Sequence, residues 1–496
     1  MIFRIAAAAL ILAAGFTLTA IADEAKEAAA PQTFVSSHSG RFNGVSVRYT
    51  ASAGETHLKD KDGKPLASIF SIAYVREGVS DPAARPVVFL FNGGPGSASL
   101  WLHMGAFGPK RVVLPSDAKD DGAAPYRIED NPLALLDIAD FVFIDPVGTG
   151  FSRPLGDHKG EEFWGITEDA KSVAQFIRAW VTKNGRWNSP KYVGGESYGT
   201  VRTSAVVNEL EGGINDIALN GIILVSTLQS YWDSNNAPGN DFAYIAYVPT
   251  MTATAVYHGQ IDLAGRPLAE FLDEVRAWAL EEYLPALYLG DRLAAERAAA
   301  IAGKLAAYTG LSESYVRNAK LRIDPGRFQK ELLRNKGLTI GRLDSRYTGV
   351  DADNAGEFPD FDPSFYGIDA GYTAAVNDYL RRTLKVAIEG DYEPLSFQVN
   401  RAWNAKIEDS DFNYGVAHYV AKATRENSEF RIFNAAGYYD FATPFFESEN
   451  AFARAGLAPG RITYAYYEAG HMMYVHQPSI EKLMKDVRDF ILAGAR

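Results

Sequence analysis

Short apolar runs separated by helical segments constrain this chain more than any other feature of its sequence. The runs hold two to five residues each and lie at 87–91, 141–144, 192–193, 221–225 and 432–433. Segments with helical periodicity, such as 167–181 and 200–210, lie between several of them. Continuous apolar strands alternating with helices are typical of a largely parallel sheet that is covered on both faces. The sequence therefore predicts an α/β fold.

Two regions depart from this pattern. Residues 45–49 and 67–74 alternate between apolar and polar side chains around an Asp-Gly-Lys turn, which predicts antiparallel strands before the parallel ones. Residues 231–415 interrupt the strands and contain two predicted helices, 291–308 and a second one that Asp324-Pro325 opens and Gly337 ends. A helical insertion of this kind is typical of a lid over a site. We expect a catalytic domain formed by 32–230 and 416–496, with 231–415 as its cap.

The first 22 residues resemble an export signal. Arg4 supplies a positive start, residues 5–17 are almost wholly apolar, and Ala20-Ile21-Ala22 has the small-x-small pattern of a cleavage site. An uncleaved anchor helix is the alternative, because residues 5–22 are just long enough to span a bilayer. With cleavage after Ala22, we expect a periplasmic or secreted bacterial protein without stable membrane insertion.

Charge and cysteine content exclude several classes of protein. The net charge of −12 comes without a run of Lys or Arg, which argues against nucleic acid as a partner. The sequence contains no cysteine, so it excludes a thiol enzyme, a lipoprotein and a Cys-ligated metal site. We expect no metal and no cofactor, and the sequence does not predict an oligomeric state.

The segment Gly195-Glu196-Ser197-Tyr198-Gly199 follows one predicted strand and opens one predicted helix. A serine on such a tight strand-to-helix turn is lifted clear of the sheet, and the glycines avoid clashes that a β-carbon would create. The helix N-terminus then points at the oxygen that becomes negative during acyl transfer. Ser197 is the predicted nucleophile.

A serine hydroxyl needs a base and an acid that orients the base. Among eight histidines, His471 is best placed because it follows the last predicted strand, and His103 is the alternative. Asp440 follows the strand before it and would stabilise the imidazolium, although an aspartate there is also a common turn residue. The order Ser, Asp, His is that of α/β-hydrolases, so we expect the α/β-hydrolase fold.

A glycine-rich loop follows the first predicted parallel strand, at Asn92-Gly93-Gly94-Pro95-Gly96. In this fold such a loop supplies the second donor to the oxyanion. A phosphate-binding loop is the competing interpretation, but the segment lacks the spacing and the Lys-Ser/Thr ending of that motif.

Four blocks together resemble the signatures of the serine carboxypeptidase family. They occur in the family's order and are Asn92-Gly93-Gly94-Pro95-Gly96-Ser97, Asp145-Pro146-Val147-Gly148-Thr149-Gly150-Phe151-Ser152, Gly195-Glu196-Ser197-Tyr198-Gly199 and Gly470-His471-Met472. The resemblance implies a triad of Ser197, Asp440 and His471 and an activity that removes C-terminal residues from peptides. It further implies oxyanion donors at Gly94 and Tyr198, and a site for the substrate's terminal carboxylate at Asn92, Gly93 and Glu196.

Glu196 has an independent physical rationale. An ionised carboxyl repels a substrate carboxylate, whereas a protonated one donates a hydrogen bond to it, so we expect activity to favour acidic pH. Support of the turn alone is the other interpretation of Glu196.

The sequence departs from the family at three places. Ala106 stands where relatives have a second glutamate of the carboxylate site, Thr200-Val201-Arg202 replaces the usual Gly and Tyr, and Tyr438 stands where many relatives have an aspartate. Disulfides typical of eukaryotic relatives are also absent. These differences leave the substrate preference open.

Two other functions remain as alternatives. The missing glutamate favours an esterase or acyltransferase with the same triad, and a non-catalytic binding protein is the third possibility. The acidic segment 351–362 partly resembles a calcium loop, but Ala355 is no ligand and Asp362 replaces the terminal Glu, which favours an acidic lid loop. Tyr244, Tyr247 and Tyr257 are expected in the core or a pocket wall.

Overall fold

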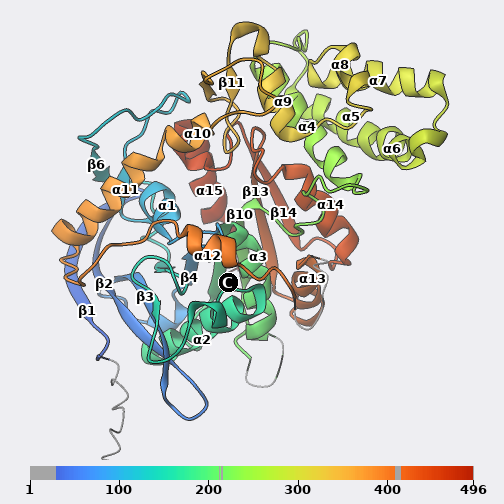
Figure 1. The fold of residues 1–496 in the computed structure, drawn as a ribbon. Helices are drawn as coiled ribbons and strands as arrows, with labels where there is room; N and C mark the ends of the chain where they lie inside the picture. The colour runs from blue at the N-terminus through green and yellow to red at the C-terminus, as the bar shows by residue number, and fades with distance from the viewer. Residues whose placement is uncertain (1–28, 212, 214–215, 408–414, 495–496) are drawn as a thin grey trace, which may run out of the picture.

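A central ten-stranded sheet positions the candidate residues (Figure 1). The computed structural model describes residues 29–211, 213, 216–407 and 415–494. The predicted signal, residues 1–22, lies outside the described residues. Among the helices of the described ranges, none is both long and apolar enough to cross a bilayer.

The order of the strands is β1-β2-β3-β7-β4-β9-β10-β13-β14, with the short β8 beside β3. The strands are β1 (Thr33–Phe42), β2 (Val45–Lys59), β3 (Pro65–Arg76), β4 (Val87–Phe91), β7 (Asp140–Ile144), β8 (Arg153–Pro154), β9 (Lys191–Ser197), β10 (Gly221–Thr227), β13 (Arg431–Gly437) and β14 (Ile462–Tyr467). The pairs from β1 to β7 are antiparallel, and those from β7 to β14 are parallel. The predicted antiparallel start and parallel body are confirmed.

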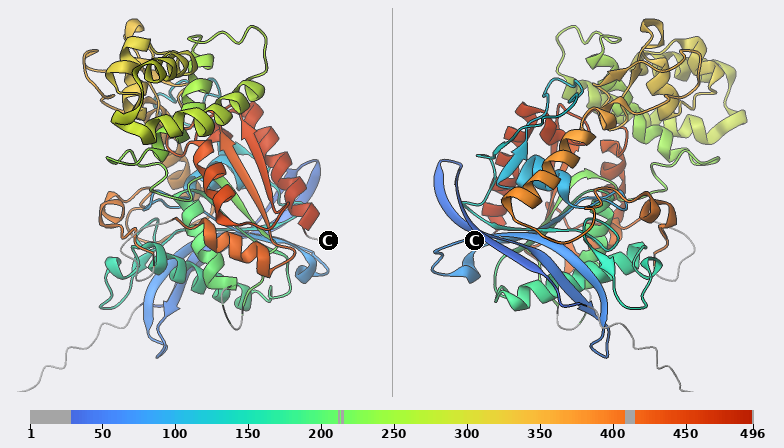
Figure 2. Two further views of the ribbon diagram at one scale, coloured as in Figure 1. Left: turned by 90° about the vertical axis from the view of Figure 1, so that its right-hand side faces the viewer. Right: turned by 60° about the vertical axis from the view of Figure 1, so that its left-hand side comes forward.

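Helices cover both faces of the parallel strands (Figure 2). Val87 and Phe89 of β4 pack in one core with α2 (Ile166–Lys183), α3 (Tyr198–Glu211), α13 (Ala417–Glu426) and α14 (Phe445–Ala455). Val88 and Leu90 pack in the opposite core with α1 (Leu100–Leu102), α11 (Asp369–Asp378) and α15 (Gln477–Gly494). Because successive side chains of a strand point to opposite faces, such a strand is apolar at every position.

The predicted insertion divides into two parts in the structure. Its first part forms a separate apolar core with residues that follow β13, and it holds α4 (Phe242–Tyr257), α5 (Leu268–Trp278), α6 (Leu284–Leu289), α7 (Ala295–Thr309), α8 (Glu313–Asn318) and α9 (Pro325–Glu331). Its second part returns across the sheet domain with α10 (Pro363–Tyr366), α11 and α12 (Phe397–Ala402) (Figure 1). The boundaries 231 and 415 stay a prediction.

Two short hairpins complete the described elements. They are β5 (Lys110–Val112) with β6 (Ile128–Asp130), and β11 (Thr339–Ile340) with β12 (Thr348–Gly349). The residues after β11 reach the candidate site.

A buried ion pair ties α2 to α3 beneath that site. The Arg202 guanidinium donates from Nε to Asp169 Oδ2 at 2.6 Å and from Nη1 to the Asn92 carbonyl at 2.5 Å. The two side chains are only 1% and 2% exposed. Burial raises the pKa of Asp169, and the Arg202 charge opposes that rise. Arg202, one of the departures from the family pattern, thus supports the glycine-rich loop from below.

We expect Arg202→Met to destabilise the protein by about 3–5 kcal/mol, because it leaves the Asp169 carboxylate buried without its partner. Urea unfolding followed by circular dichroism measures the change. The double variant Arg202→Met/Asp169→Asn should recover part of the loss. A single variant that unfolds within about 1 kcal/mol of the parent would show that the pair does not hold the two helices.

Candidate active site

The turn at Ser197 joins the end of β9 to the start of α3. Ser197 has a φ of 60°, in the left-handed region. A β-carbon on Gly195 would lie 2.2 Å from the Gly199 carbonyl oxygen, and one on Gly93 would lie 2.5 Å from the Tyr198 nitrogen. The glycines therefore permit a turn that side chains would block, and the turn presents the Ser197 hydroxyl at the carboxyl edge of the sheet.

His471 and Asp440 form a buried pair. His471 follows β14, Asp440 follows β13, and His471 Nδ1 lies 2.7 Å from Asp440 Oδ2. Burial alone would lower the pKa of His471, but the charge and hydrogen bond of Asp440, together with the charge of Glu196, raise it. Asp440 thus fixes the ring orientation and favours the imidazolium, which are the two tasks of the acid in a triad.

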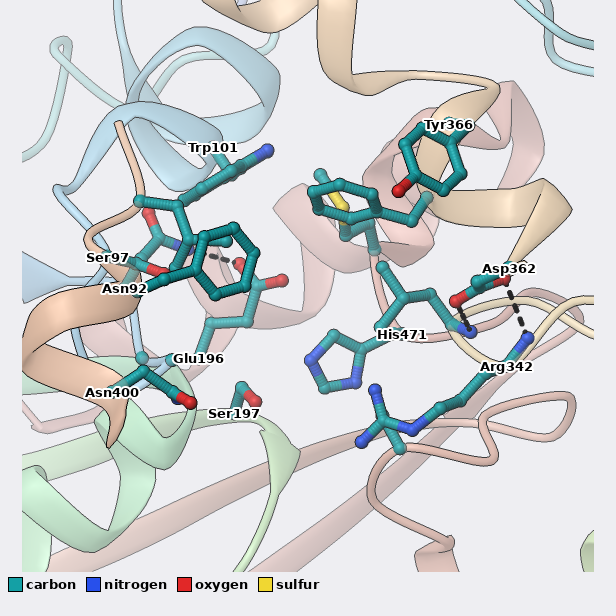
Figure 3. Close-up of a pocket in the computed structure, with 18 of the residues that line it drawn as sticks. Asn92, Ser97, Trp101, Glu196, Ser197, Arg342, Asp362, Tyr366, Asn400 and His471 are labelled. Carbon is teal, nitrogen blue, oxygen red and sulfur yellow. Dashed lines mark hydrogen bonds between the residues drawn. The ribbon is translucent and has the colours of Figure 1, made fainter. Parts of the chain in front are cut away.

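Ser197 and His471 line one cleft (Figure 3). Its volume is about 430 Å³, in the range of small-molecule sites. Within the described residues, no hydrogen bond joins the Ser197 hydroxyl to the imidazole. Such bonds are often long in unliganded hydrolases and shorten when substrate binds. The structure therefore places Ser197 and His471 at one cleft, with the buried Asp440 bound to the imidazole of His471.

A segment of the insertion links the two catalytic loops. The His471 N–H donates to the Leu343 carbonyl at 2.6 Å, and the Phe441 N–H donates to the Arg342 carbonyl at 3.0 Å. Gly470 packs so closely that its β-carbon would lie 2.4 Å from that of Asp344. Sequence analysis missed this segment, because no motif marks backbone contacts made across 100 residues.

Glu196 is buried beside the nucleophile. Its Oε2 accepts hydrogen bonds from Asn92 Nδ2 and from the Tyr474 hydroxyl, both at 2.7 Å. The Asn92 amide is itself oriented, because its Oδ1 accepts the Leu102 N–H at 3.0 Å. Burial raises the pKa of Glu196 to about 7, although both donors oppose the rise. Near neutral pH this carboxyl is therefore partly protonated.

The glycine-rich loop reaches the start of α3. Gly93 and Gly94 both line the cleft, and Gly94 has a φ of 101°. Tyr198 is the first residue of α3, and the close approach of Gly93 to its nitrogen brings the loop and the helix start together. The predicted oxyanion donors, Gly94 and Tyr198, thus lie on adjacent segments beside Ser197.

Comparisons with known proteins agree with this geometry. Residues 70–262 match a family model described as serine carboxypeptidase. The resemblance to serine carboxypeptidases is confirmed. Two Arabidopsis thaliana proteins are similar to this chain. Serine carboxypeptidase-like 16 is 29% identical over 168 residues, which cover 32% of this chain and 37% of that protein. Serine carboxypeptidase-like 13 is 30% identical over 156 residues, which cover 30% of this chain and 34% of that protein. The matches thus span about a third of these relatives.

A solved structure extends the likeness in fold. The Kex1(delta)p carboxypeptidase of Saccharomyces cerevisiae, described as prohormone-processing, superposes with a TM-score of 0.53 over 89% of this chain and 91% of its own, at 14% identity. At this identity the likeness concerns the fold, and it confirms the predicted α/β-hydrolase architecture.

The position of the missing family glutamate is filled differently here. Ala106 is fully buried, and a β-carbon on the preceding Gly105 would lie 2.5 Å from the Tyr372 hydroxyl and from the Tyr474 ring. Two tyrosines thus pack against the helical turn His103–Phe107 beside Ala106, and one of them, Tyr474, donates a hydrogen bond to Glu196. The sequence gives no signal for Tyr474 beyond its place three residues after His471.

The alternative base, His103, is a core residue. Its Nε2 lies 2.7 Å from the Tyr74 hydroxyl, and burial lowers its pKa to about 3. The residue is 1% exposed and is not among those that line the cleft. His103 therefore remains neutral and packs the sheet.

The acidic segment 351–362 binds donors from the protein. The Lys330 ammonium forms an ion pair with Asp351 and donates to the Asp353 carbonyl at 2.7 Å. Asp362 accepts the N–H groups of Arg342 and Ser364 at 2.9 and 3.0 Å and caps α10. These contacts agree with the acidic loop that we favoured over a calcium site.

We expect a fluorophosphonate probe to label Ser197 in the folded protein. Ser197→Ala should abolish labelling, and His471→Ala should slow it by about 100-fold or more, because the base removes the hydroxyl proton. Intact-mass spectrometry measures both. The control is His476→Ala, which removes a nearby histidine bound to Ser479 and should label at the parent rate. Labelling of the Ser197→Ala protein, or unchanged labelling without His471, would exclude this catalytic pair.

Proposed function

We propose that this protein is a serine carboxypeptidase that hydrolyses the C-terminal peptide bond of peptides through an acyl-enzyme. The observation that carries the proposal is the buried carboxyl of Glu196, which lies next to the nucleophile and has a pKa of about 7. An esterase that does not bind a terminal carboxylate does not require a protonatable carboxyl at this position. The family model that matches residues 70–262 supports the same function.

The chemistry follows from the positions of the side chains. The Ser197 oxygen attacks the carbonyl carbon of the last peptide bond while His471 accepts the hydroxyl proton. The oxyanion receives the N–H groups of Gly94 and Tyr198, and Asp440 stabilises the imidazolium. His471 then returns the proton to the departing amine, and the terminal amino acid leaves. A water molecule, deprotonated by His471, hydrolyses the acyl-enzyme and regenerates Ser197.

The substrate carboxylate would be held by Asn92, the Gly93 N–H and Glu196. Glu196 Oε2 already accepts two hydrogen bonds within the protein, so the proton of the neutral carboxyl is best carried by Oε1. That proton can then be donated to the substrate carboxylate. Binding should be strong where Glu196 is protonated, below about pH 7, and weaken as the group ionises.

Export remains part of the proposal. It is supported by the signal-like pattern of residues 1–22 and by a chain without cysteine, which would need no disulfide pairing in an oxidising compartment. We propose a bacterial periplasmic or secreted enzyme, and the mass of the exported chain distinguishes cleavage after Ala22 from an anchor.

We expect the protein to hydrolyse a peptide with a free C-terminal carboxylate at least about 100-fold faster than the same peptide with a C-terminal amide. The amide cannot pair with the carboxylate site and leaves its polar groups unsatisfied. Mass spectrometry of the products gives kcat/KM for both peptides. Equal rates would exclude carboxylate recognition, and transfer of the acyl group to an added alcohol in preference to water would favour the acyltransferase alternative.

We expect Glu196→Gln to remove the rise in KM that the parent shows as pH passes through 7. The amide stays neutral at every pH and keeps a donor for the substrate carboxylate. Steady-state kinetics between pH 4.5 and about 8.5 measure the effect. The variant also lacks the charge that raises the pKa of His471, so the acid limb of kcat/KM should move to lower pH.

Glu211→Gln is the matched control. Burial raises the pKa of Glu211 to about 7 as well, but this residue lies at the far end of α3 and accepts from the Leu219 N–H. Its variant should keep the parent pH profile of KM. If Glu196→Gln kept the pH dependence of KM seen in the parent, Glu196 would not be the group that binds the terminal carboxylate of the substrate.

A further inference from the structure

Arg342 places a positive charge in the cleft beside the catalytic histidine. Its side chain lines the cleft, and Figure 3 shows the guanidinium next to the His471 ring, across Ser197 from Asn92 and Glu196. The backbone of this segment is held firmly, because the Arg342 carbonyl accepts the Phe441 N–H and the Arg342 N–H donates to Asp362. The backbone of Arg342 is therefore anchored beside the cleft that its side chain lines.

The Arg342 guanidinium has no acidic partner among the residues that the structure describes. Asp362, a carboxylate of the same cleft, accepts from other donors: the N–H groups of Arg342, Leu343 and Ser364 at 2.9, 3.2 and 3.0 Å, and the Ser364 hydroxyl. Within the described residues, the guanidinium forms no ion pair and no side-chain hydrogen bond. Other arginines near the site, such as Arg202 and Arg346, are paired with aspartates.

An unpaired cation at this position opposes the reaction that the site performs. His471 becomes positively charged when it accepts the Ser197 proton, and the charge of Arg342 opposes the net rise in the pKa of His471 that Asp440 and Glu196 cause. A substrate anion beside Arg342 would offset this repulsion when the imidazolium forms. The arrangement thus favours substrates that bring a negative charge to this side of the nucleophile.

The terminal carboxylate of the substrate is assigned to the other side. Asn92 and Glu196 face the cleft across Ser197 from Arg342 (Figure 3), and Gly93, next to Asn92 in the chain, also lines the cleft. Resting on the proposed carboxypeptidase function, we infer that Arg342 pairs with a second carboxylate, the side chain of an aspartate or glutamate that flanks the scissile bond. Planar guanidinium groups bind carboxylates through two parallel hydrogen bonds, which suits this task. Arg342 is then a specificity-determining residue.

The test compares matched peptides with a free C-terminus. One pair has Glu or Gln as the penultimate residue, and the other has Glu or Gln as the last residue. At pH 6 the glutamate side chain is ionised. We expect the parent to prefer Glu over Gln by about tenfold or more in kcat/KM in one of the two pairs, which identifies the residue that contacts Arg342.

Three variants assign the preference to the charge. Arg342→Gln should abolish it, Arg342→Lys should keep part of it, and Arg342→Glu should replace it with a preference for Lys over Gln. With a substrate whose side chains are uncharged, Arg342→Gln should also move the acid limb of kcat/KM to higher pH. The variant no longer has the guanidinium charge that repels the His471 imidazolium. Arg297→Gln makes the same charge change on α7 and should behave as the parent.

Distinct outcomes would overturn the inference. They are equal hydrolysis of Glu and Gln peptides by the parent in both pairs, and a preference that survives in Arg342→Gln. Loss of the distinction between free acid and amide in Arg342→Gln would also overturn it, because Arg342 would then bind the terminal carboxylate. If the parent cleaves free-acid peptides with uncharged side chains, each of these results refutes the role of Arg342 and leaves the proposed carboxypeptidase function intact. If it cleaves none, the proposed function fails as well.

Discussion

The tight turn between β9 and α3 is the constraint on which the rest of the site depends. β9 lies between β4 and β10 in the parallel part of the sheet, so its carboxyl end lies at the same edge as the ends of β4, β13 and β14. Ser197 stands at that end with a left-handed φ, and Gly93, Gly195 and Gly199 allow the neighbouring backbones to approach it. The loops with Asn92, Asp440 and His471 then converge on one hydroxyl because parallel strands bring their carboxyl ends together.

Two buried carboxyls near Ser197 differ because their surroundings differ. Asp440 accepts hydrogen bonds from the N–H groups of Ala442 and Thr443 and from the Thr443 hydroxyl, in addition to its bond with His471. Glu196 has an amide and a phenol as donors, and burial dominates, so its pKa rises to about 7. One site thus holds a carboxyl that orients the base and a second, protonatable carboxyl suited to a substrate carboxylate.

The sequence predicts those parts of the fold and site that local patterns determine. The strand before Ser197, the helix after it and the Asp324 cap of α9 follow from turn chemistry and periodicity, and the chain order of Ser197, Asp440 and His471 indicates the fold. The predicted helix start at 291 was early, because Leu293 and Ala294 have extended ψ angles of 125° and 141°, so α7 begins only at Ala295. Arg342 and Tyr474 carry no local signal, because tertiary contacts alone bring them beside Glu196 and His471.

The segment after β11 connects the wall of the cleft to the loops that hold His471 and Asp440. Leu343 accepts the His471 N–H, Arg342 accepts the Phe441 N–H, and Asp344 accepts the Gly470 N–H, so one short stretch of the insertion fixes the loops of both the base and the acid. The same stretch carries the guanidinium that faces the cleft. A shift of this backbone moves the imidazole and the charge together, so a sequence change elsewhere in the insertion acts on both through these hydrogen bonds. The insertion is therefore part of the catalytic apparatus as well as a wall of the cleft.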